Sequence, residues 1–191
     1  MDRPERLSKM KGSRSHVDVE SLKPCVGCGA LILPDVDVSA RSYVGALPGC
    51  WAIFLEILEK EYGDYRYASA HRLSTDSYMA QHPGEPSRRS IRSVAVHLIG
   101  LHLALEQGCG SSEVMKAMQR AANRKRDFVW LDPPASLGEV TVLDVRQARN
   151  PAEHAGLVEW WARSIWEAWL PHHETVRRWT HEPLELPEVI L

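Results

Sequence analysis

The sequence predicts a mostly α protein: a helical bundle of about five to six helices, preceded by a small N-terminal cysteine knuckle or hairpin. Apolar residues recur at helical spacing through most of the chain after residue 48, and prolines, glycines and cap residues divide these stretches into helix-sized pieces. The chain has 191 residues, 44% of them hydrophobic and 25% charged. This size and composition are typical of one ordinary globular domain.

The ends of the chain differ in composition from the middle. Residues 1–18 are polar and basic, so we expect a disordered tail there. Residues 183–191 contain two prolines and are expected to form an extended arm. Between them, residues 19–182 are predicted to form a single helical metal-binding domain.

A cysteine motif opens this domain, in the stretch Cys25-Val26-Gly27-Cys28-Gly29. Two cysteines separated by two residues and followed by glycine are typical of a zinc knuckle. A redox dithiol has the same spacing but normally begins a helix, which Gly29 and Pro34 disfavour. Residues 31–46 are expected to form a short hairpin after the knuckle.

Cys50 is the candidate third ligand. It lies in Pro48-Gly49-Cys50-Trp51, where a proline marks the start of a helix predicted over residues 49–62. The helix dipole favours a thiolate at this position. Cys25, Cys28 and Cys50 could thus bind a metal with a histidine or water as the fourth ligand. The alternative is that Cys50 is only a buried residue of the helix start.

The second predicted helix, over residues 65–81, carries an unusual polar stripe. Its members follow one another at spacings of four, four, three and four, which places them on one helix face. They are Tyr67, His71, Thr75, Tyr78 and His82. We interpret His71 and His82 as metal ligands and Asp76, which points elsewhere, as a partner that orients a ligand. A buried hydrogen-bonded network without metal is the alternative.

The remaining helices are predicted from their caps and apolar faces. Ser87 caps a helix that ends before Gly108, and Asn150 with Pro151 begins a tryptophan-rich helix that reaches residue 170. Pro171 is expected to kink or restart that helix. We expect further helices over residues 111–124 and, briefly, from Thr141 onward. The tryptophans fall on more than one side of their helix, which favours a core role over a dimer face.

Further histidines lie inside these helices. His97 and His102 are five apart on the most apolar helix and must point in different directions. His172 and His173 follow Pro171, and we expect one of them to face inward. The predicted metal site therefore draws on Cys25, Cys28, Cys50, His71, His82 and His172, with Tyr78 and His97 as candidate catalytic groups.

Two functions fit this pattern. The favoured one is a metal-binding helical protein, with zinc as the expected metal and iron or copper left open, acting as a metal-dependent enzyme on a small molecule. The alternative is a non-catalytic regulatory or interaction module stabilised by structural zinc.

Charge and hydropathy limit the expected partners and location. The net charge is −2, and no apolar run is long enough to cross a bilayer, so we expect neither nucleic acid nor membrane as a partner. A small molecule and a second copy of the chain remain candidate partners. The polar, basic start of the chain lacks the apolar core of a secretory signal, which predicts a cytoplasmic location.

Several short motifs together resemble a bacterial family of unknown function. They are Cys-x-x-Cys-Gly-Ala from Cys25, Pro-Gly-Cys-Trp from Pro48, His-Arg-Leu-x-x-Asp-x-Tyr from His71, Gln-His-Pro-Gly from Gln81 and Trp-x-Pro-His-His from Trp169. The resemblance spans roughly residues 24–180. It implies that these motifs belong to one domain, and it implies no activity, cofactor or mechanism.

Overall fold

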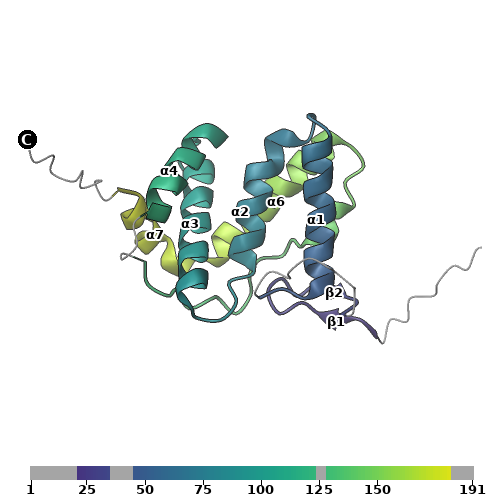
Figure 1. Ribbon diagram of the computed structural model, residues 1–191, viewed down its shortest axis with the longest axis horizontal. Helices are drawn as coiled ribbons and strands as arrows, with labels where there is room; N and C mark the ends of the chain where they lie inside the picture. Colours follow the sequence, from purple (N-terminus) through teal and green to yellow (C-terminus); the bar gives the residue numbers. More distant parts are fainter. Residues whose placement is uncertain (1–20, 35–44, 124–127, 182–191) are drawn as a thin grey trace, which may run out of the picture.

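The computed structural model describes residues 21–34, 45–123 and 128–181, and these residues form a mostly helical fold with one small sheet (Figure 1). The elements, in chain order, are β1 (Lys23–Pro24), β2 (Leu31–Ile32), α1 (Pro48–Gly63), α2 (His71–Gln81), α3 (Arg88–Leu105), α4 (Ser111–Asn123), α5 (Val142–Arg146), α6 (Pro151–Ala168) and α7 (His173–His181). Short 3-10 turns over Ala68–Ala70 and Leu170–His172 precede α2 and α7. The mostly α prediction is confirmed. The predicted tail and arm lie outside the described residues.

The two strands and the turn between them form the cysteine knuckle. β1 pairs with β2 in antiparallel fashion, with Lys23 opposite Ile32 and Pro24 opposite Leu31. The hairpin expected over residues 31–46 begins with Leu31–Ile32, which pairs with the strand before the cysteines. Its second half includes residues 35–44, outside the described residues. Figure 1 shows this small sheet beside the N-terminal end of α1.

The helix starts follow the predicted caps. The Ser87 hydroxyl accepts a hydrogen bond from Ser90 N at 3.1 Å, and Asn150 Oδ1 accepts one from Glu153 N at 3.0 Å. Thr141 and Asp144 form a reciprocal capping box at the start of α5. These bonds satisfy amides that have no partner inside the helix.

Two of the predicted helices differ in detail. The polar stretch from Tyr65 forms turns first, and α2 begins only at His71. The apolar pattern predicts a face of α1 made by Trp51, Phe54, Leu55 and Leu58. The buried side chains are instead those of Cys50, Ile53, Phe54, Ile57 and Glu61, and Trp51, Leu55 and Leu58 are half-buried.

Helix α2 lies between α3 and α6 (Figure 1), and tryptophans of α6 fix its C-terminal end. Trp169 Nε1 donates to Ala80 O at 3.2 Å, and Trp161 Nε1 donates to Gln81 Oε1 at 2.9 Å. The Gln81 amide then donates to Leu137 O and Val140 O at 2.9 and 2.8 Å. Gln81 is fully buried, so this network holds the residue just before His82 in one position.

The tryptophan-rich helix is a core element, as predicted. Trp161 and Trp169 are fully buried, and Trp166 is nearly so, whereas Trp160 is half-exposed. The histidine pair after Pro171 divides as expected. His173 is buried and stacks on Trp166, and His172 is less buried, with its Nε2 donating to Asp132 O at 2.9 Å.

Glu106, at the end of α3, joins three helices. Its carboxylate accepts hydrogen bonds from Arg177 on α7, at 2.5 and 2.9 Å, from Trp166 on α6, at 3.1 Å, and from His102 on α3, at 3.0 Å. The Arg177 guanidinium, with help from Trp166, lowers the pKa of Glu106 to about 2.

Acid should therefore weaken the attachment of α7. A carboxyl with a lowered pKa in the folded state stabilises the fold fully above its unfolded pKa, and this stabilisation is lost as the pH falls toward the folded value. We expect Glu106→Gln to lower the free energy of unfolding at pH 6, and the gap between variant and wild type to narrow at pH 3. Urea unfolding at both pH values measures the gap. Glu56→Gln, which removes the half-exposed ion pair with Arg146, should leave only a small gap at either pH.

Candidate metal centre

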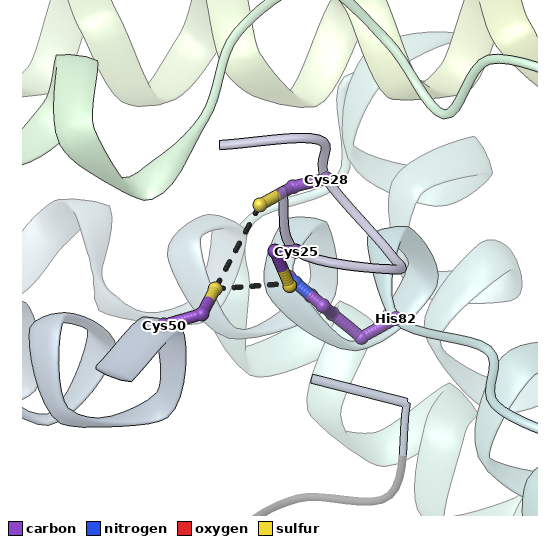
Figure 2. Close-up of side chains that lie close together, drawn as sticks. All are labelled: Cys25, Cys28, Cys50 and His82. Carbon is purple, nitrogen blue, oxygen red and sulfur yellow. Dashed lines mark hydrogen bonds between the residues drawn. The ribbon is translucent and has the colours of Figure 1, made fainter. Parts of the chain in front are cut away.

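Four predicted ligands come together at one end of the bundle (Figure 2). Cys25 and Cys28 come from the turn between β1 and β2, Cys50 from the first turn of α1, and His82 from the residue after α2. Their ligand atoms all lie within 4.8 Å of one another, and all four residues are buried. In the described part of the chain, this is the one group of three or more such side chains close enough to share a metal ion.

The distances fit a tetrahedral metal site. Cys28 Sγ lies 3.7 Å from Cys50 Sγ, and Cys50 Sγ lies 3.4 Å from His82 Nε2. A tetrahedral zinc ion with Zn–S of about 2.3 Å and Zn–N of about 2.0–2.1 Å would separate two sulfurs by about 3.8 Å, and a sulfur from a nitrogen by about 3.6 Å. These two spacings match those expected around such an ion, and all the donor atoms lie within 4.8 Å of one another.

The knuckle turn brings its two sulfurs inward. Gly29 N donates to Cys25 O at 2.8 Å, and Cys25 N donates to Ala30 O at 2.9 Å, which closes the turn. Gly29 has a φ of 72°, a left-handed conformation that glycine adopts without strain. The Leu47 amide approaches Cys25 Sγ at 3.5 Å. This confirms the role expected of the glycine after the second cysteine.

His82 is oriented by the helix that ends before it. Its Nδ1 lies 2.8 Å from Tyr78 O, a carbonyl in the last turn of α2. A carbonyl only accepts, so Nδ1 carries the proton and the lone pair of Nε2 faces the sulfurs. Metal-binding histidines usually have such a partner on the other ring nitrogen.

The three cysteines shift one another's pKa values in opposite directions. Hydrogen bonds from Cys28 and then Cys50 lower the pKa of Cys25, and the Leu47 amide adds to this effect. The pKa of Cys28 and that of Cys50 are raised, first by their hydrogen bonds to Cys25 and further by burial. The helix start was expected to favour a thiolate at Cys50, whereas the pKa of Cys50 is raised and that of Cys25 is lowered. A metal cation that displaces the thiol protons would remove this difference.

Tyr78 lies against the cluster but is sealed from solvent. Its hydroxyl donates to Cys50 Sγ at 3.8 Å, and its ring stacks between Phe54 and His82 at centroid distances of 3.9 and 4.1 Å. Burial raises the pKa of Tyr78, and the neighbouring cysteines raise it further. In this position the phenol orients a ligand sulfur.

The other predicted site residues lie elsewhere. His71 is at the far end of α2, and eleven residues of helix separate it from His82 by about 16 Å, too far to share an ion. His97 donates to Asp76 at 2.7 Å, and Arg72 also binds that carboxylate. His172 binds the backbone of Asp132. None of His71, His97 and His172 belongs to the four-residue group.

A second buried polar network was missed from the sequence. Glu61 has a fully buried carboxylate that contacts His71, Ser74 and His154. A signal was available, because Glu61 continues the spacing of Cys50, Phe54 and Ile57, and His154 continues that of Val158 and Trp161. Each polar residue stands where the pattern would place another apolar one.

Comparison with known proteins places most of the chain in one family. A family model described as "Family of unknown function (DUF5946)" matches residues 23–170, which include all four residues of the metal centre. No curated protein and no solved structure matches. The match confirms the resemblance that the motifs indicate, and it ends just before Pro171 and the histidine pair. Because the family model covers more than half of the chain, the protein belongs to the DUF5946 family of unknown function.

Proposed function

We propose that this protein is a zinc-stabilised binding module, in which a structural zinc ion holds the N-terminal knuckle against α1 and α2. The observation that carries the proposal is the closed set of four buried protein ligands. Structural zinc sites use four protein ligands of this kind, whereas catalytic zinc sites keep one position for water or substrate. Three thiolates and one imidazole also suit zinc better than the harder divalent cations.

The same geometry weighs against the enzyme that the sequence favoured. A metal-dependent enzyme needs an open coordination position and a proton-transfer group within reach of substrate. Tyr78 is fully buried beside the cluster, and His97 is bound to Asp76 outside it. The metal-dependent enzyme stays a prediction without support from these positions.

A cavity of about 480 Å³ beside the zinc knuckle supports a binding role. One wall comes from the knuckle, and the others come from the segment before α1, the segment after His82 and the loop before α5. Its lining residues are Val26, Gly27, Gly45, Ala46, Leu47, Pro83, Gly84, Glu85, Pro133, Pro134, Ala135 and Leu137. A pocket of this size fits a small molecule. Zinc would shape the pocket, since Gly27 lies between two of the ligand cysteines.

No helix in the described part of the chain is both long and apolar enough to cross a membrane. In the proposed module, the zinc ion would stabilise the fold by fixing the knuckle. It would also support ligand binding, because the knuckle forms one wall of the pocket.

Elemental analysis should find about one zinc per chain, as expected for a single tetrahedral site. Cys50→Ser should lose this zinc and unfold at a lower temperature, because serine is a poor ligand for zinc and the buried cluster is left incomplete. Cys109→Ser is the matched control, since Cys109 is half-buried and outside the cluster. Equal zinc content in the two variants would contradict the proposed site.

Gly27→Ala should weaken zinc binding without removing a ligand. A Cβ at this position would overlap the ring of His82 and lie 2.7 Å from Gln81 O, so the imidazole must shift. Changes that disturb the orientation of a ligand typically reduce metal affinity about 10–100-fold, and we expect a loss in this range from competition with a chromophoric chelator. Gly156→Ala, in α6, meets no atom within 4 Å. It should leave the affinity unchanged and stabilise the helix by up to about 1 kcal/mol.

The pocket is tested by a fragment screen. We expect ligand-observed NMR to detect small molecules that bind the zinc-loaded protein and no longer bind Ala46→Trp, whose indole would fill the cavity. Ala46 lines the pocket and is not a metal ligand, so this variant should keep its zinc. Fragments that bind wild type and Ala46→Trp equally would show that this cavity is not the binding site.

A further inference from the structure

A surface tyrosine is hydrogen-bonded into the Glu61 network, at the end of α2 opposite the metal centre. Tyr62 is 74% exposed, and its hydroxyl lies 2.7 Å from His71 Nε2. The two rings meet at a centroid distance of 4.3 Å with a tilt of 51°. The phenol therefore faces solvent while its oxygen is held by an imidazole.

The imidazole is oriented to accept the phenol proton. His71 Nδ1 lies 3.1 Å from Glu61 Oε2. An ionised carboxylate can only accept, so Nδ1 carries the ring proton and donates it to Glu61. The lone pair of Nε2 is then free to accept from the Tyr62 hydroxyl. Nucleophile, base and orienting acid stand in hydrogen-bond contact in that order, as they do in sites of nucleophilic catalysis.

The orienting acid is itself rigidly held. Glu61 is 1% exposed, Ser74 Oγ donates to its Oε1 at 2.5 Å, and His154 Nε2 donates to the same oxygen at 2.8 Å. Burying a carboxylate is costly unless several donors compensate for its lost hydration. The chain thus contains a buried acid with three donors, one of which leads directly to an exposed hydroxyl.

The basic residues that flank Tyr62 in sequence have other partners. Arg66 is engaged by Asp64 in an ion pair of 2.6 Å, and Lys60 donates to Ala148 O and lies over the ring of Tyr67. These cations flank Tyr62 in sequence but are already occupied. A phosphoryl donor, with several negative charges, would need such a cation, whereas an acyl donor would not.

We propose that Tyr62 is a nucleophilic acceptor site for an acyl group from an activated acyl donor, with His71 as general base and Glu61 as the positioning residue. The phenol oxygen attacks the acyl carbon, and its proton passes to His71 Nε2. The bond from the acyl carbon to the leaving group breaks, and the proton passes from His71 to the leaving group. The product is an ester on Tyr62. This inference goes beyond the zinc-stabilised module and does not depend on the metal.

Acetylation with N-acetylimidazole tests the site on the full, zinc-loaded chain. Peptide mass spectrometry follows O-acetyl-tyrosine at each position over time. Tyr65 is the internal control because it is 87% exposed, so accessibility alone would make it the faster of the two. General-base help is worth about 10²–10⁴-fold where it is fully used, and we expect Tyr62 to react at least about tenfold faster than Tyr65.

Variants show whether the fast acetylation of Tyr62 depends on His71 as a general base or on other features of its surroundings. His71→Ala should bring the Tyr62 to Tyr65 rate ratio down to about one or below while the zinc content is kept, because His71 is not in the metal cluster. Tyr62→Phe should remove the fast acetylation, and Tyr65→Phe should leave it intact. Equal rates at Tyr62 and Tyr65 in the wild type, or an unchanged ratio in His71→Ala, would overturn the proposal.

The role of Glu61 has a spectroscopic test. The ¹⁵N shifts of the His71 ring should show the proton on Nδ1 in the wild type. In Glu61→Gln the amide can donate to Nδ1 and move the proton to Nε2, which then cannot accept from the phenol. The rate ratio should fall together with this change. A wild-type ring protonated on Nε2 alone would contradict the assignment, whether or not the Glu61 variant folds.

Discussion

The contact among three sulfurs and one imidazole joins the N-terminal knuckle to α1 and α2, and the rest of the candidate site depends on it. Cys25 and Cys28 belong to the turn of a two-stranded sheet, and Ala30 and Ile32 of the same segment are also buried in the core. Cys50 and His82 sit at the ends of α1 and α2 that face it. Buried sulfurs and a buried imidazole need partners, and here they are one another's partners. A shared cation would turn weak mutual hydrogen bonds into four ligand bonds.

The helices present this site by a second set of contacts, in which polar atoms hold the end of α2. Gln81 uses its amide in three directions, toward Trp161 and toward two carbonyls of the loop before α5. His82 follows immediately and can then adopt a single direction. The tryptophan rings thus pack in the core, and the hydrogen bonds that the indole N–H groups of Trp161 and Trp169 donate also fix the position of a candidate ligand.

The sequence predicts the helical class, most helix starts and the four residues of the metal centre. Caps and prolines act locally, so Ser87, Thr141 and Asn150 could be recognised from their neighbours alone. The sequence fails where a site depends on the three-dimensional distance between residues. His71 and His82 share a helix face in projection, but a helical wheel discards the rise along the axis. Glu61 and His154 come together across 93 positions of sequence, which no local pattern can reveal.

The order of the ligands along the chain gives the cluster a role in the unfolded state as well. Cys28 and Cys50 are 22 positions apart, and Cys50 and His82 are 32 apart. An ion held by all of them is a reversible crosslink that closes two consecutive stretches of chain. By the chain-entropy relation used for disulfides, a closed loop of either length costs the unfolded ensemble about 3–4 kcal/mol for as long as the ion stays bound to the chain. A protein that carries its cysteines as ligands could obtain this restraint where reducing conditions would break a disulfide.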